Sequence, residues 1–107
     1  MASCRSSGVL TASAVVSAER CKLMSIHACY TGTTGVTTVK LFDNASAASG
    51  KELSRIVLQA PHAAGGEFKP SSAMLEFDMH GVIASNGLYL EISTGAGTGA
   101  AISVEFS

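Results

Sequence analysis

Residues 81–106, GVIASNGLYLEISTGAGTGAAISVEF, decide the fold of this chain. They hold two runs of alternating residues on either side of a glycine-rich link. One face of the first run is Leu88, Leu90 and Ile92, and one face of the second is Ile102, Val104 and Phe106. A period of two predicts strands that each bury one face. Because Gly95, Gly97 and Gly99 in the link tolerate positive φ, we predict that the chain ends in a β-hairpin.

The same pattern extends upstream through short segments separated by Gly, Ser and Asn turns. We predict strands at residues 9–11, 21–31, 36–43, 51–60 and 74–79, with residues 82–84 leading into an Asn86-Gly87 turn. About six to eight short strands without a long helical pattern predict an all-β, antiparallel β-sandwich or jelly roll. At 107 residues this is one domain. We expect residues 1–8 to be a flexible N-terminal arm and residues 9–107 to be the β-sandwich domain.

Two segments fit more than one structure. Residues 12–18 fit either a helical turn or an irregular edge, because alanine, serine and valine suit both. In residues 51–60, a stripe of Leu53, Ile56, Val57 and Ala60 fits a helix, but the same residues also alternate as in a strand. With strands expected on both sides and only ten residues, we predict a strand that ends at Pro61.

The segment 21–31 has two mostly apolar faces. Strict alternation places Met24, Ile26, Ala28 and Tyr30 on one face and Cys21, Leu23, Ser25, His27 and Cys29 on the other. A strand that is apolar on both sides is expected at the centre of a sheet or at an interface.

The composition excludes some partners. Only 14% of residues are charged, against about 25% in typical domains, and the formal net charge is −1. Without a basic cluster, the chain lacks the surface that nucleic acid or an anionic membrane requires, so we expect neither as a partner. Fifty residues are Ala, Ser, Gly or Thr. A small, uncharged surface of this kind suits burial against a partner or against other copies of the chain.

The three cysteines, Cys4, Cys21 and Cys29, do not predict a disulfide framework, because their number is odd. On one strand Cys21 and Cys29 would be about 26 Å apart, far beyond the reach of a disulfide. No CxxC pair is present, so we expect no metal site and interpret the cysteines as buried free thiols in a reducing compartment.

Several short motifs resemble functional signatures without their required context. Residues 95–100 match GxGxxA, but a strand pattern follows where a dinucleotide site needs a helix, so no cofactor is expected. Gly50-Lys51 resembles the end of a P-loop, but Glu52 stands where Ser or Thr would bind magnesium. Asn44-Ala45-Ser46 has the spelling of a glycosylation site, and without secretion it indicates only a turn. We expect no secretory signal, because Thr11 and Ser13 interrupt the apolar run before Ala18.

The histidines give one weak indication of catalysis. His27, His62 and His80 have no metal-ligand spacing, but Asp78 is two residues from His80 and could orient it as in a triad. No nucleophile motif completes that arrangement, so we predict no catalytic residue and no enzymatic activity.

The order of several motifs resembles a known family. They are Leu41-Phe42-Asp43, then Gly50-Lys51-Glu52-Leu53, then Gly81-Val82-Ile83 with Asn86-Gly87-Leu88-Tyr89-Leu90, and finally Ile102-Ser103-Val104-Glu105-Phe106. In this order, residues 9–106 are similar to the small β-sandwich virion structural proteins of tailed bacteriophages, especially marine ones. Many of these are head decoration, cement or head-fibre proteins.

The resemblance implies a capsid decoration protein that is made in the host cytoplasm and stabilises the outer surface of the virion head as a homotrimer. Its partners would be its own copies and the major capsid protein. Interface candidates are Tyr89 and the loops 44–50 and 95–99. An alternative is a tail or fibre attachment module that binds a host receptor or glycan. The aromatic content of 6% and the absence of Trp make that less favourable.

Overall fold

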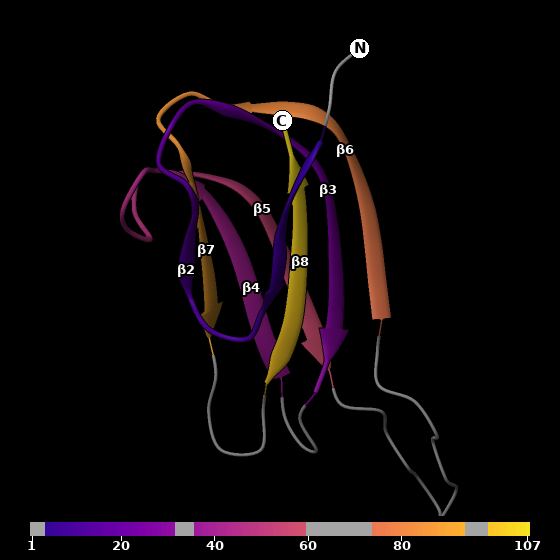
Figure 1. Ribbon diagram of the computed structural model, residues 1–107. Helices are drawn as coiled ribbons and strands as arrows, with labels where there is room; N and C mark the ends of the chain where they lie inside the picture. Colours follow the sequence, from indigo (N-terminus) through magenta and orange to yellow (C-terminus); the bar gives the residue numbers. More distant parts are fainter. Residues whose placement is uncertain (1–3, 32–35, 60–73, 94–98) are drawn as a thin grey trace, which may run out of the picture.

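The structure is a computed structural model that describes residues 4–31, 36–59, 74–93 and 99–107. All regular elements in this part of the chain are strands, in agreement with the prediction from the sequence. They are β1 (Arg5–Leu10), β2 (Ala14–Ser17), β3 (Cys21–Tyr30), β4 (Val36–Asp43), β5 (Lys51–Gln59), β6 (Met74–Ala84), β7 (Leu88–Ser93) and β8 (Ala100–Phe106). Two four-stranded antiparallel sheets pack face to face (Figure 1). Sheet A has the order β1-β8-β3-β6 and sheet B the order β2-β7-β4-β5. The predicted β-sandwich is therefore confirmed.

The core lies between the sheets and is built from alternate residues of each strand. Among the side chains that are fully buried are Leu23, Ile26, Tyr30, Val39, Leu41, Leu58, Leu88, Leu90, Ile102 and Val104. Burying such side chains stabilises the fold by about 1.5–3 kcal/mol each. The alternation of apolar and polar residues that predicted these strands therefore also indicates which face of a strand packs against the other sheet.

The predicted closing hairpin is wrong, although both of its strands are present. β7 pairs with β2 and β4 in sheet B, whereas β8 pairs with β1 and β3 in sheet A. The reason is that both strands are apolar on one face only. Those two faces can shield each other across the sandwich, whereas strands of a hairpin would still need a second layer to cover them.

A bulge in β3 changes the faces predicted for that strand. Its register against both β6 and β8 shifts between Leu23 and Ser25. As a result Leu23 and Ile26 both point into the core, and strict alternation fails at Met24. On the partner strand, His80 and Gly81 have φ of 54° and 81°. Both strands bend there over one end of the sandwich (Figure 1). β3 lies inside sheet A, as expected from its two apolar faces.

The first strand begins earlier than expected. β1 starts at Arg5, so residues 5–8 of the expected arm belong to a strand, in which Arg5 and Ser6 pair with β8 before the register shifts. The Val104 N–H donates to Ser7 Oγ at 2.9 Å, and the Arg5 guanidinium lies 4.7 Å from the centre of the Phe106 ring. These contacts let a polar segment form an edge strand, where side chains need not be apolar.

Both ambiguous segments are strands. Residues 14–17 form β2, at the edge of sheet B, and residues 51–59 form β5, as predicted. Ile56 and Leu58 point inward from β5, whereas Val57 is exposed. Alternation therefore outweighed the helical stripe, because β4 pairs with Lys51, Glu52 and every residue from Ser54 to Gln59. Ala60 lies outside the described residues.

Candidate functional site

The outer face of sheet A carries a group of polar side chains contributed by three neighbouring strands. Register places His27 of β3 between Glu76 of β6 and Ser103 of β8. Ser25, one step along, lies between Asp78 and Glu105. Three antiparallel strands thus bring together residues that are up to 80 positions apart in the sequence.

His27 joins two carboxylates. Its Nδ1 is 3.1 Å from Glu76 Oε2, and its Nε2 is 3.4 Å from Glu105 Oε1. The same Glu105 oxygen accepts a short hydrogen bond from the Ser25 hydroxyl. This bond, followed by the contact with His27, lowers the pKa of the Glu105 carboxyl below its usual value. The chain Glu76–His27–Glu105–Ser25 therefore ties β6, β3 and β8 together on the solvent side.

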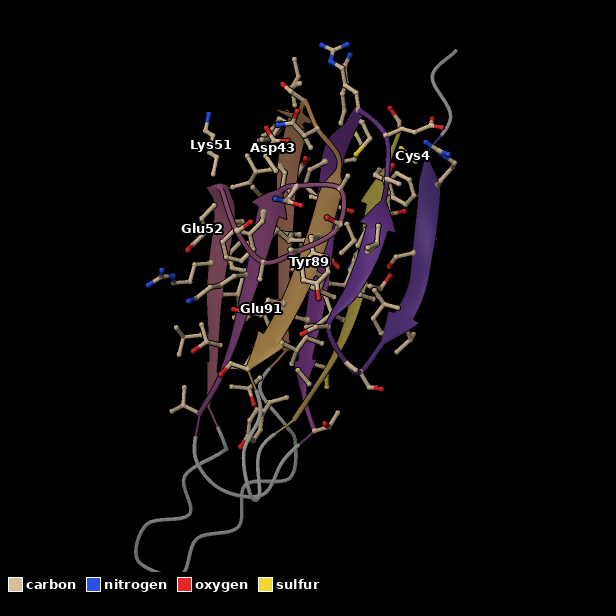
Figure 2. All side chains as sticks on the ribbon, turned by 90° about the vertical axis from the view of Figure 1, so that its left-hand side faces the viewer. Cys4, Asp43, Lys51, Glu52, Tyr89 and Glu91 are labelled. Carbon is tan, nitrogen blue, oxygen red and sulfur yellow. The ribbon has the colours of Figure 1, made fainter. Side chains whose placement is uncertain are left out.

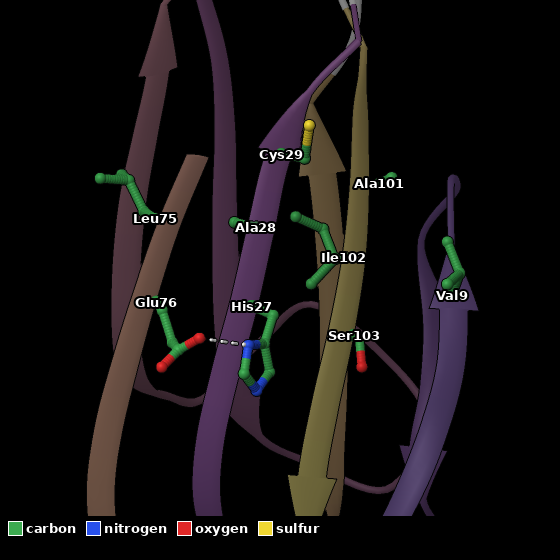
Figure 3. Close-up of a pocket in the computed structure, with 9 residues that line it drawn as sticks. All are labelled: Val9, His27, Ala28, Cys29, Leu75, Glu76, Ala101, Ile102 and Ser103. Carbon is green, nitrogen blue, oxygen red and sulfur yellow. Dashed lines mark ion pairs between the residues drawn. The ribbon is translucent and has the colours of Figure 1, made fainter. Parts of the chain in front are cut away.

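A shallow pocket of about 480 Å³ lies beside this chain (Figure 3). Ala101 and Ser103 of β8 form its floor, with Val9 of β1 on one side and His27 and Cys29 of β3 on the other. The depression arises because two small side chains on β8 stand between larger ones on the neighbouring strands. We call this depression the sheet A trough.

The arrangement does not have the geometry of a nucleophilic triad. The Ser25 hydroxyl donates to a carboxylate and not to the imidazole, so His27 is not placed to remove its proton. No group of three or more His, Cys, Asp or Glu side chains within the described ranges could hold a metal ion. What the site offers is a negatively charged end next to an apolar depression, which is suited to binding.

The structure brings the predicted pair Asp78 and His80 together, but on an open surface. His80 Nδ1 is 3.6 Å from Asp78 Oδ1, and the two side chains are 84% and 70% exposed. The His80 backbone N–H also donates to Asp78 Oδ1 at 2.9 Å. This contact forms an Asx turn, which supports the positive φ of His80 at the bend of β6. The pair therefore has a local structural role.

The predicted interface candidates lie elsewhere. Tyr89 is half-buried on the outer face of β7, next to Glu91, which is 4.0 Å from Lys40 Nζ (Figure 2). In the loop 44–50, Asn44 Oδ1 accepts hydrogen bonds from the N–H groups of Ser46 and Ala47, so the expected turn is present and has the form of an Asx turn. The loop 95–99 lies outside the described residues except for Gly99.

The other motifs have the local structures expected. Strand β8 follows the GxGxxA segment where a dinucleotide site needs a helix, and Lys51 begins strand β5. His62 lies outside the described residues. The free cysteines differ in exposure: Cys21 is buried, Cys29 is half-buried in the trough and Cys4 is exposed. The expectation that all three are buried is therefore wrong for Cys4, which precedes the first strand, and for Cys29, which is only half-buried on the outer face of β3.

Comparisons with known proteins identify no relative. No family model, no curated protein and no solved structure matches the chain. In the part of the chain that the structure describes, no helix is long and apolar enough to cross a membrane.

Proposed function

We propose that this protein is a virion structural protein, a decoration subunit that binds the outer surface of a phage head and stabilises it as a homo-oligomer. The phage assignment comes from the order of sequence motifs described above. The structural part of the proposal, a module that works by association with protein surfaces, has support from the distribution of apolar side chains.

One side of the sandwich carries the observation on which the proposal depends. β6 is an eleven-residue strand at the free edge of sheet A, and β5 is the free edge of sheet B beside it. Leu75 and Phe77 on β6 are 37% and 40% exposed, and Val57 on β5 is 55% exposed. Glu76 and Asp78 place charges on the outer face of β6, as is common at a sheet edge, but Leu75 and Phe77 on its other face remain apolar and exposed. An edge with apolar side chains in contact with water favours a protein partner.

The chemistry of the remaining surface is in keeping with this proposal. With 14% charged residues, the chain has little to keep copies apart in solution. Protein interfaces are depleted in charge at their centre, so the same composition suits a surface that is buried in an assembly.

Immunogold electron microscopy tests the proposal directly. Antibody raised against the purified chain would be applied to intact particles of the virus that encodes it, with pre-immune serum as control. Gold spread over the heads is the expected result. Gold confined to the tail would favour the attachment alternative. Particles that carry no gold, while the denatured chain reacts on a blot, would contradict both roles.

A further inference from the structure

The sheet A trough is apolar along its length and negatively charged at one end. The apolar side chains of Val9 and Ala101 line it, and Val9 is 72% exposed. Glu105 follows Ser103 by two residues on the same face of β8, so its carboxylate stands about 7 Å further along the strand. Glu76 of β6 lies on the other side of His27, toward which its carboxylate points (Figure 3).

The two carboxylates have no basic partner of their own. In the described residues neither Glu76 nor Glu105 forms an ion pair with a Lys or Arg side chain; the only basic group that either contacts there is His27, and Glu105 also accepts the hydrogen bond from Ser25. One imidazole cannot neutralise two carboxylates, so the end of the trough remains negative whether or not His27 is protonated. Asp78 lies on the same face, paired with Ser25, and adds to the negative potential. Three of the eight acidic residues in the chain therefore gather on one sheet face.

We infer that the sheet A trough is a docking site for a lysine side chain of a partner protein. The methylene groups of the lysine would lie over Ala101 and Ser103, against Val9, and the ammonium group would meet the Glu105 carboxylate. Glu76, on the far side of His27, would add negative potential. The observation that selects this occupant is charge complementarity between an apolar groove with an acidic end and a side chain with an apolar stem and a cationic tip.

The volume is also appropriate. About 480 Å³ exceeds what one side chain needs and accommodates a lysine together with the backbone that carries it. An acidic segment would be repelled by Glu76 and Glu105. A purely aliphatic residue would gain nothing from the acidic end of the trough, where the Glu76 and Glu105 side chains are 76% and 46% exposed.

Titration followed by two-dimensional ¹⁵N–¹H NMR tests the inference on the full chain. The ligands are Nα-acetyl-lysine N-methylamide and its uncharged counterpart, Nα-acetyl-norleucine N-methylamide. We expect saturable shifts of the amides of His27, Cys29, Ala101 and Ser103 with the lysine compound. The norleucine compound should bind about tenfold more weakly, since it lacks one charge-assisted hydrogen bond.

Variants identify the groups responsible. Glu76→Gln with Glu105→Gln should reduce the affinity for the lysine compound to that for norleucine. Glu91→Gln, on the outer face of sheet B, is the matched control and should bind as the unmodified chain does. If the double variant fails to fold, Glu76→Gln alone serves, because that side chain is 76% exposed. Equal binding of both compounds, or shifts confined to residues outside the trough, would overturn the inference.

Cys29 provides a second measurement that does not depend on high affinity. The chain would be equilibrated with cystamine or with bis(2-hydroxyethyl) disulfide, which place a two-carbon arm ending in ammonium or hydroxyl on a thiol. A tethered group has a millimolar or higher effective concentration, so a weak contact becomes measurable. We expect the ammonium arm to be favoured at Cys29 relative to the exposed Cys4, because Cys29 lines the trough and Cys4 does not, and Glu76→Gln with Glu105→Gln to remove that preference. The same ratio at both thiols would contradict the inference.

The inference rests on the proposed function only in assigning the lysine to a protein partner. Both measurements use the isolated chain, so they do not depend on any particle. Lysine binding without gold on the heads would keep the trough as a site and reject the decoration role. Gold on the heads without lysine binding would keep the decoration role and reject the trough as a lysine site.

Discussion

The Asp43 carboxylate accepts a hydrogen bond from the backbone N–H of Asn86, with 2.7 Å between Oδ1 and the nitrogen. This bond joins the end of β4 in sheet B to the turn through which the chain passes from sheet A to sheet B. It therefore connects the two layers of the sandwich at one end.

Replacement of Asp43 by Ala should destabilise the fold by about 1–2 kcal/mol, because the Asn86 N–H loses a charged acceptor. Asp43→Asn is the matched control: its amide oxygen can still accept the bond, and we expect a loss of at most about 1 kcal/mol. Urea unfolding with fluorescence or circular dichroism measures both. Equal stability of the Ala variant and the unmodified chain would show that the bond contributes nothing.

Gly87 occupies a position that no other residue fits. Its φ is 138°, and an added Cβ would stand 2.7 Å from the Ser17 carbonyl oxygen and 2.8 Å from Ala45 Cα. Both neighbours are backbone atoms, so relief would require movement of β2 or of the loop 44–50. Gly87→Ala should therefore destabilise the protein by about 2 kcal/mol or more.

The variant Gly8→Ala is a control that distinguishes the cost of backbone strain from the cost of steric overlap with neighbouring atoms. Gly8 also has positive φ, 73°, but an added Cβ there meets no atom within 4 Å. Gly8→Ala should cost only the backbone strain, about 1 kcal/mol. If thermal or urea unfolding gives the same loss for both variants, the close approach at Gly87 has no energetic role.

The sequence predicted strand positions well because the period of two is local. It failed where a non-local choice was needed. Nothing in the spacing of Leu88, Leu90 and Ile92 distinguishes a strand that pairs with its successor from one that faces it across the core. The bulge at Met24 was equally hidden, since it is defined by the pairing of β3 with β6 and β8 and not by the residues of β3 alone.

Part of the candidate site could be predicted from the sequence. Alternation already placed Ser25 and His27 on one face of β3, and Ser103 and Glu105 on one face of β8. What could not be inferred was that β6, β3 and β8 are neighbours, which brings Glu76 and Glu105 to the same imidazole. The pair Asp78 and His80 was found because its two residues are close in sequence, yet it is the more exposed and the less elaborate group.

The three thiols should react with iodoacetamide in a fixed order. Cys4 is exposed, Cys29 is half-buried and Cys21 is buried. Burial raises the pKa of the Cys21 thiol, despite a hydrogen bond with Ser17 that acts in the opposite direction, so less thiolate is available there. Alkylation followed by peptide mass spectrometry should show Cys4 first, Cys29 second and Cys21 only on unfolding. Rapid labelling of Cys21 in the native protein would contradict its placement in the core.

The edge of the sandwich formed by β5 and β6, where Val57, Leu75 and Phe77 are exposed, should mediate self-association. We expect the unmodified chain to be oligomeric at micromolar concentration in sedimentation experiments, and Leu75→Ser with Phe77→Ser to shift it toward monomer. Val15→Ser is the matched control, because Val15 is 45% exposed on β2, at the opposite edge of sheet B. Urea unfolding of each variant verifies that it is folded. An unmodified chain that stays monomeric, or equal dissociation by the control, would exclude this edge as the interface.

The Glu105 carboxyl should make stability depend on pH in the acidic range. Its pKa is lower in the folded protein than the ordinary value of 4.5, first because Ser25 donates a hydrogen bond to it and second because of His27. The unfolded chain therefore binds more protons at this group than the native chain does, and stability rises with pH through this window. The contribution is fully present above 4.5 and is lost as the pH falls through the lower, folded-state pKa.

Urea unfolding at a series of pH values tests this with Glu105→Gln, which can still accept the Ser25 hydroxyl but does not titrate. We expect the variant to lose less stability on acidification than the unmodified chain. Part of the dependence should remain, because the pKa of Glu52 is also lowered, chiefly by its hydrogen bond with Arg55. Glu52→Gln should remove that part and leave the Glu105 contribution intact. An identical pH profile for Glu105→Gln and the unmodified chain would show that the contacts of Glu105 with Ser25 and His27 do not favour its ionised form.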